Sequence, residues 1–322
     1  MLTNARILTE EAELARSLPC LRVTRPIAPI NPETGFRVSG SYRRTVHRSD
    51  AFMIEDSSVS AEGPGPSGYE TKYQVVLPYL GLFEYNVGRR ACHVDSACTL
   101  FVSPDREYFD VHPLPNVGHS GIVINVRPDL IEEMLRDQEA ETAFFDMVRP
   151  ATPRLKLFTQ HMLRAAEFGG DPLYADECTV AALSEALGTR PKGKPRNSRV
   201  VQNAKMVLHA RESERVSLGE VAAEVGVSGI YLTQEFSRVE GIPLYQYQLQ
   251  LLMNRSLVEL PHCESITGLA LDLGFSSHSH FTSAFRRHFG ITPSDYRLGK
   301  CIDPASFRGT WQSGRTLLRH AS

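Results

Sequence analysis

The chain lacks the features of a secreted, membrane-embedded or disulfide-stabilised protein. Its 322 residues include only six cysteines, and no two of them form a CxxC pair. This usage is typical of free thiols in a reducing compartment. The N-terminus has no basic-then-apolar signal pattern, and no apolar run approaches the roughly 18 residues that a bilayer span needs. We therefore expect a cytoplasmic protein that does not enter a membrane.

Strong charge and enzyme motifs are also missing. The formal net charge is −2, so the overall charge does not indicate nucleic-acid binding. There is no glycine-rich phosphate loop, no nucleophile elbow and no pattern of a catalytic triad. A length of 322 residues with 42% hydrophobic residues favours two globular domains with ordinary buried cores.

The most informative stretch is Ser265–Tyr296. Apolar residues recur at helical spacing from Ile266 to Leu273, and Gly274 follows, where a residue with positive φ ends a helix at little cost. Ser276 and Ser277 are suited to cap the next helix. These signals predict two short helices joined by a tight turn.

The second of these helices has two different faces. Phe281, Phe285 and Phe289 lie on its predicted buried face. The opposite face carries short hydrogen-bonding side chains and a cation, namely His278, Ser279, Thr282, Ser283 and Arg286. This composition is typical of the recognition helix of a helix-turn-helix motif.

The same unit occurs twice. Ser217–Pro243 aligns with the later stretch at a shift of 48 residues, which becomes 49 after the turn, so that Gly226 corresponds to Gly274 and Phe236 to Phe285. Leu244–Leu260 lies between the copies and predicts a connecting helix of roughly 25 Å. Such a connector would place two recognition helices about one DNA turn apart, roughly 34 Å, on one face of the duplex.

The doubled motif resembles the DNA-binding domain of the AraC/XylS family of transcription regulators, from about 198 to 298. The second copy, GFSSHSHFTSAFRRHFGITPSDYR, carries the most specific matches. These are Gly274, Phe275, Phe281, Phe285, Gly290, Thr292, Pro293, Tyr296 and Arg297. The first copy matches at Ala222, Gly226, Ser228, Leu232, Phe236 and Gly241. Gln250 and Leu252 depart from the family, whose members often carry arginine there.

The resemblance implies which residues contact DNA. In the first unit they are Ser228, Gly229, Ile230, Thr233, Gln234 and Arg238. In the second they are Ser277, His278, Ser279, His280, Thr282, Ser283, Arg286 and Arg287. Glutamine can bond adenine in a bidentate way, and threonine or isoleucine can meet a thymine methyl, so contacts of this kind discriminate by about 1–3 kcal/mol each.

The charge of this region is low for a DNA-binding domain. Residues 198–299 hold nine Lys and Arg against ten Asp and Glu, a net of −1. Because phosphate attraction supplies most non-specific affinity, we expect weak binding to random DNA. The preceding stretch 190–197, RPKGKPRN, has the composition of a linker; its four cations could either contact phosphates or belong to a solvated hinge.

The N-terminal part predicts an antiparallel β-domain. Six short runs rich in Val, Phe, Tyr and Ile lie between Tyr73 and Val126, with turn residues such as Gly81 between them. Further strand-like pieces occur near 37–44 and 51–57. This pattern favours a double-sheet barrel. It is also similar to the cupin-like sensor domains of the family, at Gly81, Phe83, Val94-Asp95 and His112-Pro113. We expect a cupin-like barrel at about 36–126.

Helices are predicted after the barrel, at 128–136, 153–168 and 175–187. They either pack on their own barrel or pair with a second subunit, and the family implies a homodimer. The expected fold class is therefore α+β: a sensor and dimerisation domain at 1–189 with helices at about 128–187, a linker at 190–197, a DNA-binding domain at 198–298 with two helix-turn-helix motifs, and a tail at 299–322.

The predicted function is a sequence-specific transcription regulator that responds to a small-molecule effector. The resemblance implies an activator that binds double-stranded DNA and contacts RNA polymerase. Aromatic residues of the barrel are the candidate effector site: Tyr73, Phe83, Tyr85, Phe101, Tyr108 and Phe109. The alternative is that at least half of these residues pack in the core of the barrel and do not contact an effector.

Two other classes of function remain open: a metal-dependent cupin-type enzyme fused to a DNA-binding module, and a structural DNA-binding protein with an idle barrel. We expect no cofactor and no metal site. His278 and His280 are two residues apart on a helix and point about 200° away from each other, so they cannot easily share an ion. His112 and His119 lack the His-x-His and following glutamate of a cupin metal site.

Overall fold

A computed structural model describes residues 41–59, 67–114, 117–135, 144–168, 171–189, 198–211 and 215–299. The predicted linker at 190–197, the predicted strand at 37–40 and the tail after Gly299 lie outside the described residues. None of the described helices is long and apolar enough to cross a bilayer.

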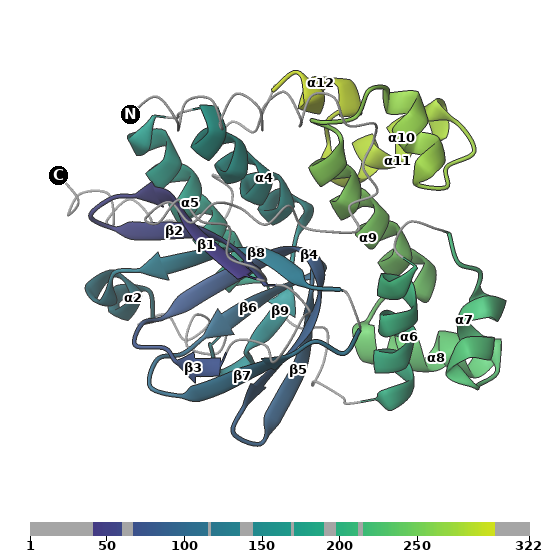
Figure 1. The fold of residues 1–322 in the computed structure, drawn as a ribbon, viewed down its shortest axis with the longest axis horizontal. Coiled ribbons are helices and arrows are strands. Elements are labelled where there is room, and N and C mark those ends of the chain that lie inside the picture. Colours follow the sequence, from purple (N-terminus) through teal and green to yellow (C-terminus); the bar gives the residue numbers. More distant parts are fainter. Residues whose placement is uncertain are drawn as a thin grey trace, which may run out of the picture.

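The N-terminal region is an antiparallel sheet of nine strands that share β4 as their centre (Figure 1). One path runs β1-β2-β8-β4-β6-β9, while β3, β7 and β5 join through the other half of β4. The strands are β1 Ser41–Arg48, β2 Phe52–Val59, β3 Ser67–Tyr69, β4 Gln74–Val87, β5 Arg90–Asp95, β6 Cys98–Val102, β7 Glu107–Val111, β8 His119–Val126 and β9 Val148–Pro150. In the described residues this sheet is open, so the predicted closed barrel is not found.

Strand β4 corrects a second prediction. The sequence predicts two strands separated by a turn at Gly81, but β4 continues for 14 residues through that position. Gly81 has φ of +79°, and a Cβ there would lie 1.9 Å from the carbonyl oxygen of Gly118. The glycine and an irregularity between Pro78 and Leu80 bend the strand instead of ending it. One half of β4 therefore pairs with β8 and β6, and the other half with β5 and β7.

Three helices follow the sheet: α2 Pro128–Leu135, α4 Pro153–Phe168 and α5 Pro172–Gly188. These positions agree with the three helices that the sequence predicts. Leu155, Phe158 and Met162 of α4 and Leu183 of α5 are buried in one core with the sheet residues around Ile54. Figure 1 shows α4 and α5 lying across one side of the sheet.

The C-terminal region is all helical. Its elements are α6 Arg199–Ala210, α7 Leu218–Val225, α8 Gly229–Glu240, α9 Leu244–Glu259, α10 Ile266–Asp272, α11 His278–Phe289 and α12 Pro293–Arg297. The pairs α7–α8 and α10–α11 are the two predicted helix-turn-helix units, and α9 connects them (Figure 1). Each unit has its own core, around Leu232 and Phe236 in the first and Phe281 and Phe285 in the second.

The predicted turn chemistry is present in both units. Gly226 and Gly274 have φ of +75° and +73°, where a glycine avoids the steric cost of a side chain. Ser228 and Ser277 accept hydrogen bonds from the backbone N–H groups of Tyr231 and His280, so each caps its recognition helix. Ser276 does not cap the helix; its hydroxyl instead contacts Nδ1 of His280 at 3.2 Å.

Candidate nucleic-acid interface and ligand cavity

Helix α8 exposes the face that the sequence assigns to DNA. Leu232 and Phe236 are fully buried, whereas Thr233, Gln234 and Arg238 are exposed. Ile230 is 75% exposed, so its side chain is available for contact with another molecule.

Tyr231 is a candidate that the sequence analysis did not include. It is 48% exposed and directly follows Ile230 on α8. A signal was present, because an aromatic residue at the start of a recognition helix has a flat face and a hydroxyl suited to base edges or phosphates. Leu218 on the preceding helix is also exposed and lies against Gly229.

Helix α11 presents a more polar face. Ser279, His280 and Ser283 are exposed, and His278 and Thr282 are half-buried. Arg286 and Arg287 are exposed in the last turn. These side chains can donate and accept hydrogen bonds over the length of the helix.

The cations of the two recognition helices differ in their surroundings. The guanidinium of Arg238 bonds the carboxylate of Glu235 through Nε at 2.7 Å, so its charge is largely balanced within α8. Among the described residues Arg286 and Arg287 form no ion pair. Of the two recognition helices, α11 is therefore the one whose described arginines form no ion pair.

The two units also contact each other. The guanidinium of Arg215, which precedes α7, lies 4.4 Å from the ring centroid of Phe275 in the turn of the second unit. A Cβ at Gly274 would lie 2.9 Å from Cγ of Arg215. This stacking helps to fix one unit against the other, together with α9.

The turn between β5 and β6 of the N-terminal sheet contacts the helices around the first unit. Asp95 ends β5, and its Oδ2 accepts a hydrogen bond of 2.5 Å from the hydroxyl of Tyr247 on α9. The same oxygen lies 3.5 Å from Nζ of Lys205 and 3.8 Å from Nε2 of His209, both on α6. Lys205 also contacts Glu240 of α8 at 3.0 Å. We call these five residues the clasp.

The carboxylate of Asp95 is stabilised within the clasp. Burial disfavours the Asp95 carboxylate, but Lys205 and the hydrogen bonds from His209 and Tyr247 outweigh burial and hold its pKa well below the usual range. Burial likewise opposes the charge of Lys205, and Asp95 and Glu240 reverse that effect and raise its pKa. The clasp is thus a buried, charged link between the sheet and the helices that carry the first recognition helix.

Two further contacts join the regions. Nδ2 of Asn254 on α9 donates to the carbonyl of Ser96 at 2.8 Å, in the same β5–β6 turn that follows Asp95. Arg164 of α4 donates to the carbonyl of Tyr296 at 3.0 Å and lies over its ring. The sheet therefore holds the first unit through buried charges, while α4 holds the second unit.

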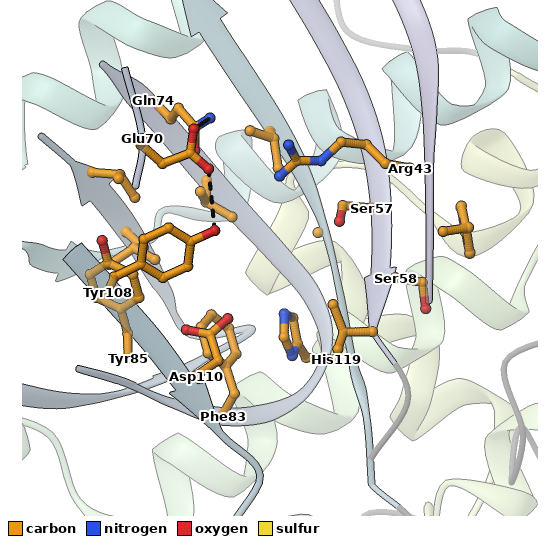
Figure 2. A pocket seen from close by; sticks show the side chains of 17 residues that line it. Arg43, Ser57, Ser58, Glu70, Gln74, Phe83, Tyr85, Tyr108, Asp110 and His119 are labelled. Carbon is orange, nitrogen blue, oxygen red and sulfur yellow. Dashed lines mark hydrogen bonds between the residues drawn. The ribbon is translucent and has the colours of Figure 1, made fainter. Parts of the chain in front are cut away.

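A cavity of about 520 Å³ lies on the face of the sheet opposite to the core that packs against α4 and α5 (Figure 2). This size is typical of small-molecule sites. Its apolar lining includes Val76, Phe83, Leu100, Val102 and Val123. Its polar lining is Tyr42, Arg43, Ser57, Ser58, Glu70, Gln74, Tyr85, Tyr108, Asp110 and His119.

The structure brings three of the six predicted effector aromatics to this cavity, namely Phe83, Tyr85 and Tyr108. Phe101 lies between Leu100 and Val102, so strand alternation turns it to the opposite face and into the core under the helices. Alternation also turns Phe109 outward, where it is 48% exposed. Tyr73 packs edge-on against Phe144 at 4.9 Å, away from the cavity.

Asp110 is one of the cavity residues that the sequence did not suggest, although the same alternation could have found it. It lies two residues after Tyr108 on β7 and therefore points to the same side. Its exposed fraction is 9%, and its Oδ1 is buried without a hydrogen-bond partner among the described residues. Burial alone raises the pKa of this carboxyl to about 7.

The two histidines that were weighed as metal ligands, His112 and His119, lie together, and His119 lines the cavity. Nε2 of His112 and Nδ1 of His119 are 3.0 Å apart, and His119 stacks on Phe83 with ring centroids 3.8 Å apart. Burial, with a smaller effect of His112, lowers the pKa of His119 to about 3, so this ring is neutral. In the described part of the chain no third His, Cys, Asp or Glu joins them to form a metal-binding group.

Residues 221–299 match the profile of a family described as a helix-turn-helix domain. The chain is 32% identical over 134 residues to the HTH-type transcriptional regulator RipA of Corynebacterium glutamicum, which covers 41% of this chain and 39% of that protein. It is 28% identical over 155 residues to the Msm operon regulatory protein of Streptococcus mutans, covering 44% of this chain and 55% of that protein.

Among solved structures, a transcriptional regulator with an AraC-type DNA-binding domain from Chromobacterium violaceum is 34% identical. The match covers 31% of this chain and 91% of that one, with a TM-score of 0.30. The chain thus spans about half or less of the length of the two curated relatives above.

Proposed function

The chain belongs, through its C-terminal domain, to the AraC/XylS family of transcription regulators, and from this premise we propose that it is a sequence-specific DNA-binding regulator controlled by a small molecule. The observation that carries the proposal is the pair of capped helix-turn-helix units, each with a recognition helix whose outer face is exposed. The connecting helix α9 has 16 residues and is about 24 Å long, a length compatible with two adjacent major grooves.

The two recognition helices would read DNA differently. Ile230, Thr233 and Gln234 supply methyl contacts and one bidentate hydrogen-bonding group. His280 and Ser283 supply polar contacts, while Arg286 and Arg287 reach toward phosphates. The first unit would contribute base preference without much charge, and the second would anchor the protein to the backbone.

The cavity is the proposed effector site, and β4 is the proposed route to the DNA-binding units. Phe83 lines the cavity, and its neighbour Leu82 is paired with Asp95 of the clasp in the β4–β5 register. A ligand that displaces Phe83 therefore acts one residue from the position that holds α6 and α9. The ligand must prefer one arrangement of the clasp, because a ligand with equal affinity for both shifts nothing.

Several finer features rest on the family alone. We propose that the open sheet is a cupin-like sensor domain, that the chain forms a homodimer through the helices around α4 and α5, and that it activates transcription through RNA polymerase. A dimer on two half-sites would multiply the modest specificity of a single chain.

The experiment that tests the function is selection of bound DNA from a random pool by the full chain. We expect an enriched sequence with two conserved blocks about one helical turn apart. Enrichment of a single block, or none, would contradict the paired docking of α8 and α11.

Substitutions on the two recognition helices should separate those blocks. Gln234→Ala and Ser283→Ala should each relax base preference in a different block, at a cost of about 1–3 kcal/mol for the preferred base, because each removes a base-edge hydrogen bond. Selection repeated with each variant measures this. An unchanged profile for Gln234→Ala would show that the docking of the first helix is wrong.

Arg287 on α11 and Arg238 on α8 allow a matched test of phosphate contacts. Arg287→Ala should weaken all sequences alike and reduce the slope of log affinity against log salt by about 0.9, the expected effect of one lost phosphate contact. Arg238→Ala should change the slope less, because Glu235 already balances that guanidinium. Titrations at several salt concentrations compare them, and an equal loss for both would refute this contrast between α8 and α11.

A further inference from the structure

The cavity contains one acidic group, Asp110, for which the described part of the chain provides no counterpart. Asp110 is nine-tenths buried, and its Oδ1 has no hydrogen-bond partner among the described residues. A buried carboxylate without partners is costly, and such groups are generally paired in folded proteins. Because Asp110 lines the cavity, a bound ligand could supply the hydrogen-bond donor that its carboxylate lacks.

The other charged groups of the cavity are engaged or neutral. Glu70 accepts hydrogen bonds from the hydroxyl of Tyr108 at 3.3 Å and from Nε2 of Gln74 at 2.9 Å. His119 is a neutral ring stacked on Phe83. Figure 2 shows the carboxyl of Asp110 among the rings of Phe83, Tyr85 and Tyr108, with His119 opposite.

Arg43 is the cavity residue that would favour an anion instead. Its side chain is 45% exposed, and its guanidinium lies 4.0 Å from the carboxylate of Glu55. Solvent screens a charge at this exposure, and Glu55 partly balances it. Asp110 is the more deeply buried of the two charges, so it has the larger influence on which ligand enters.

The apolar and aromatic lining of the cavity indicates what kind of ligand body would accompany a group bound to Asp110. Val76, Leu100, Val102 and Val123 form apolar surface, and three aromatic rings lie near Asp110. Aromatic faces attract cations within about 6 Å. We propose that the effector is an organic ammonium ion, a protonated primary or secondary amine on an apolar body of drug-fragment size, whose N–H groups donate to Asp110. This inference rests on the proposed role of the cavity as the effector site.

The direct test is calorimetry on the full chain with three probes of similar shape: 2-phenylethylamine, neutral 2-phenylethanol and the anion 3-phenylpropanoate. We expect the amine to bind about 10- to 100-fold more tightly than the other two, which is the strength of a charge-assisted hydrogen bond. Equal or tighter binding of the alcohol or the anion would overturn the proposal, as would the absence of measurable amine binding at about 1 mM.

Asp110→Asn keeps the shape of the side chain and removes its charge. It should abolish the preference for the amine and leave the affinity for 2-phenylethanol within about twofold. The matched control is Glu70→Gln, which should keep the preference, because Glu70 already has two partners. A preference that follows Glu70 and not Asp110 would refute the assignment.

Two further measurements keep this inference separate from the proposed function. Leu100→Trp should fill the cavity and abolish binding of every probe, which locates the site. If the anion or the alcohol binds there and changes DNA occupancy, the cavity is an effector site for another ligand class and the ammonium assignment fails. If the amine binds through Asp110 without any effect on DNA occupancy, the assignment holds and the regulatory role of the cavity fails.

Discussion

The clasp and the cavity each bury an aspartate beside the same strand, but they surround it differently. Asp95 is paired with Leu82 of β4 and Asp110 with Tyr85, three residues further along. Asp95 has partners on α6 and α9, so its carboxylate is stabilised. Within the described ranges Asp110 has no such partner, and burial alone raises its pKa. The presence or absence of such partners distinguishes a carboxylate that joins two parts of the protein from one that could bind a ligand.

The largest expected effect is on stability. Asp95→Leu should lower the free energy of unfolding by about 3 kcal/mol or more, because Lys205 loses a buried counter-charge. Asp110→Leu should leave it unchanged or raise it, because it replaces an unsatisfied carboxyl with apolar surface. Urea unfolding at pH 7.5 measures both. A control is the double substitution Asp95→Leu with Lys205→Met, which should recover much of the loss.

The pH dependence of stability should have opposite signs for the two aspartates. Asp110 has a raised pKa of about 7, so its contribution is greatest below its unfolded value near 3.8 and is lost as the pH rises through 7. Asp95 has a lowered pKa, so its contribution is present above about 3.8 and is lost as the pH falls.

Asp110→Asn should therefore remove a decline of about 1–4 kcal/mol in unfolding free energy between pH 4 and pH 7.5. Chemical unfolding across this range is the measurement. If wild type and Asp110→Asn show the same slope, Asp110 is partnered in solution and the contrast with Asp95 does not hold.

The smallest expected effect concerns the tyrosines beside each aspartate. Tyr247→Phe should cost about 1–3 kcal/mol of stability, because it removes the hydrogen bond to the buried carboxylate of Asp95. Tyr85→Phe should cost less than about 1 kcal/mol, since the Tyr85 side chain faces the cavity. Thermal unfolding of the two variants measures both losses of stability. A larger loss for Tyr85→Phe than for Tyr247→Phe would contradict the contrast between the two aspartates.

Local signals predicted the C-terminal domain well. The helical spacing of Leu232 and Phe236, the serine caps and the glycine turns all lie within a few residues of the structure they specify, and the duplicated unit repeats them. The same holds for the helices after the sheet. These features could be read from the sequence because their hydrogen bonds and periodicity are local.

The N-terminal domain was less predictable. The sequence indicated β-strands, yet it predicted a closed barrel and a turn at Gly81 where the structure has an open path and a bent strand. Of the six aromatic residues chosen as effector candidates, Tyr73, Phe101 and Phe109 do not line the cavity. Alternation along each strand, which puts Tyr108 and Asp110 on one side, was the better guide.

The sequence alone therefore determined the two helix-turn-helix units, their serine caps and the exposed faces of α8 and α11. Only the tertiary structure decided which acidic side chains have partners and which remain unpaired among the described residues. Asp95 and Tyr247 are 152 positions apart, and no local pattern indicates that their side chains meet. The charge state of a buried carboxyl depends on partners that the fold supplies or withholds, so only the folded chain distinguishes the satisfied Asp95 from the solitary Asp110.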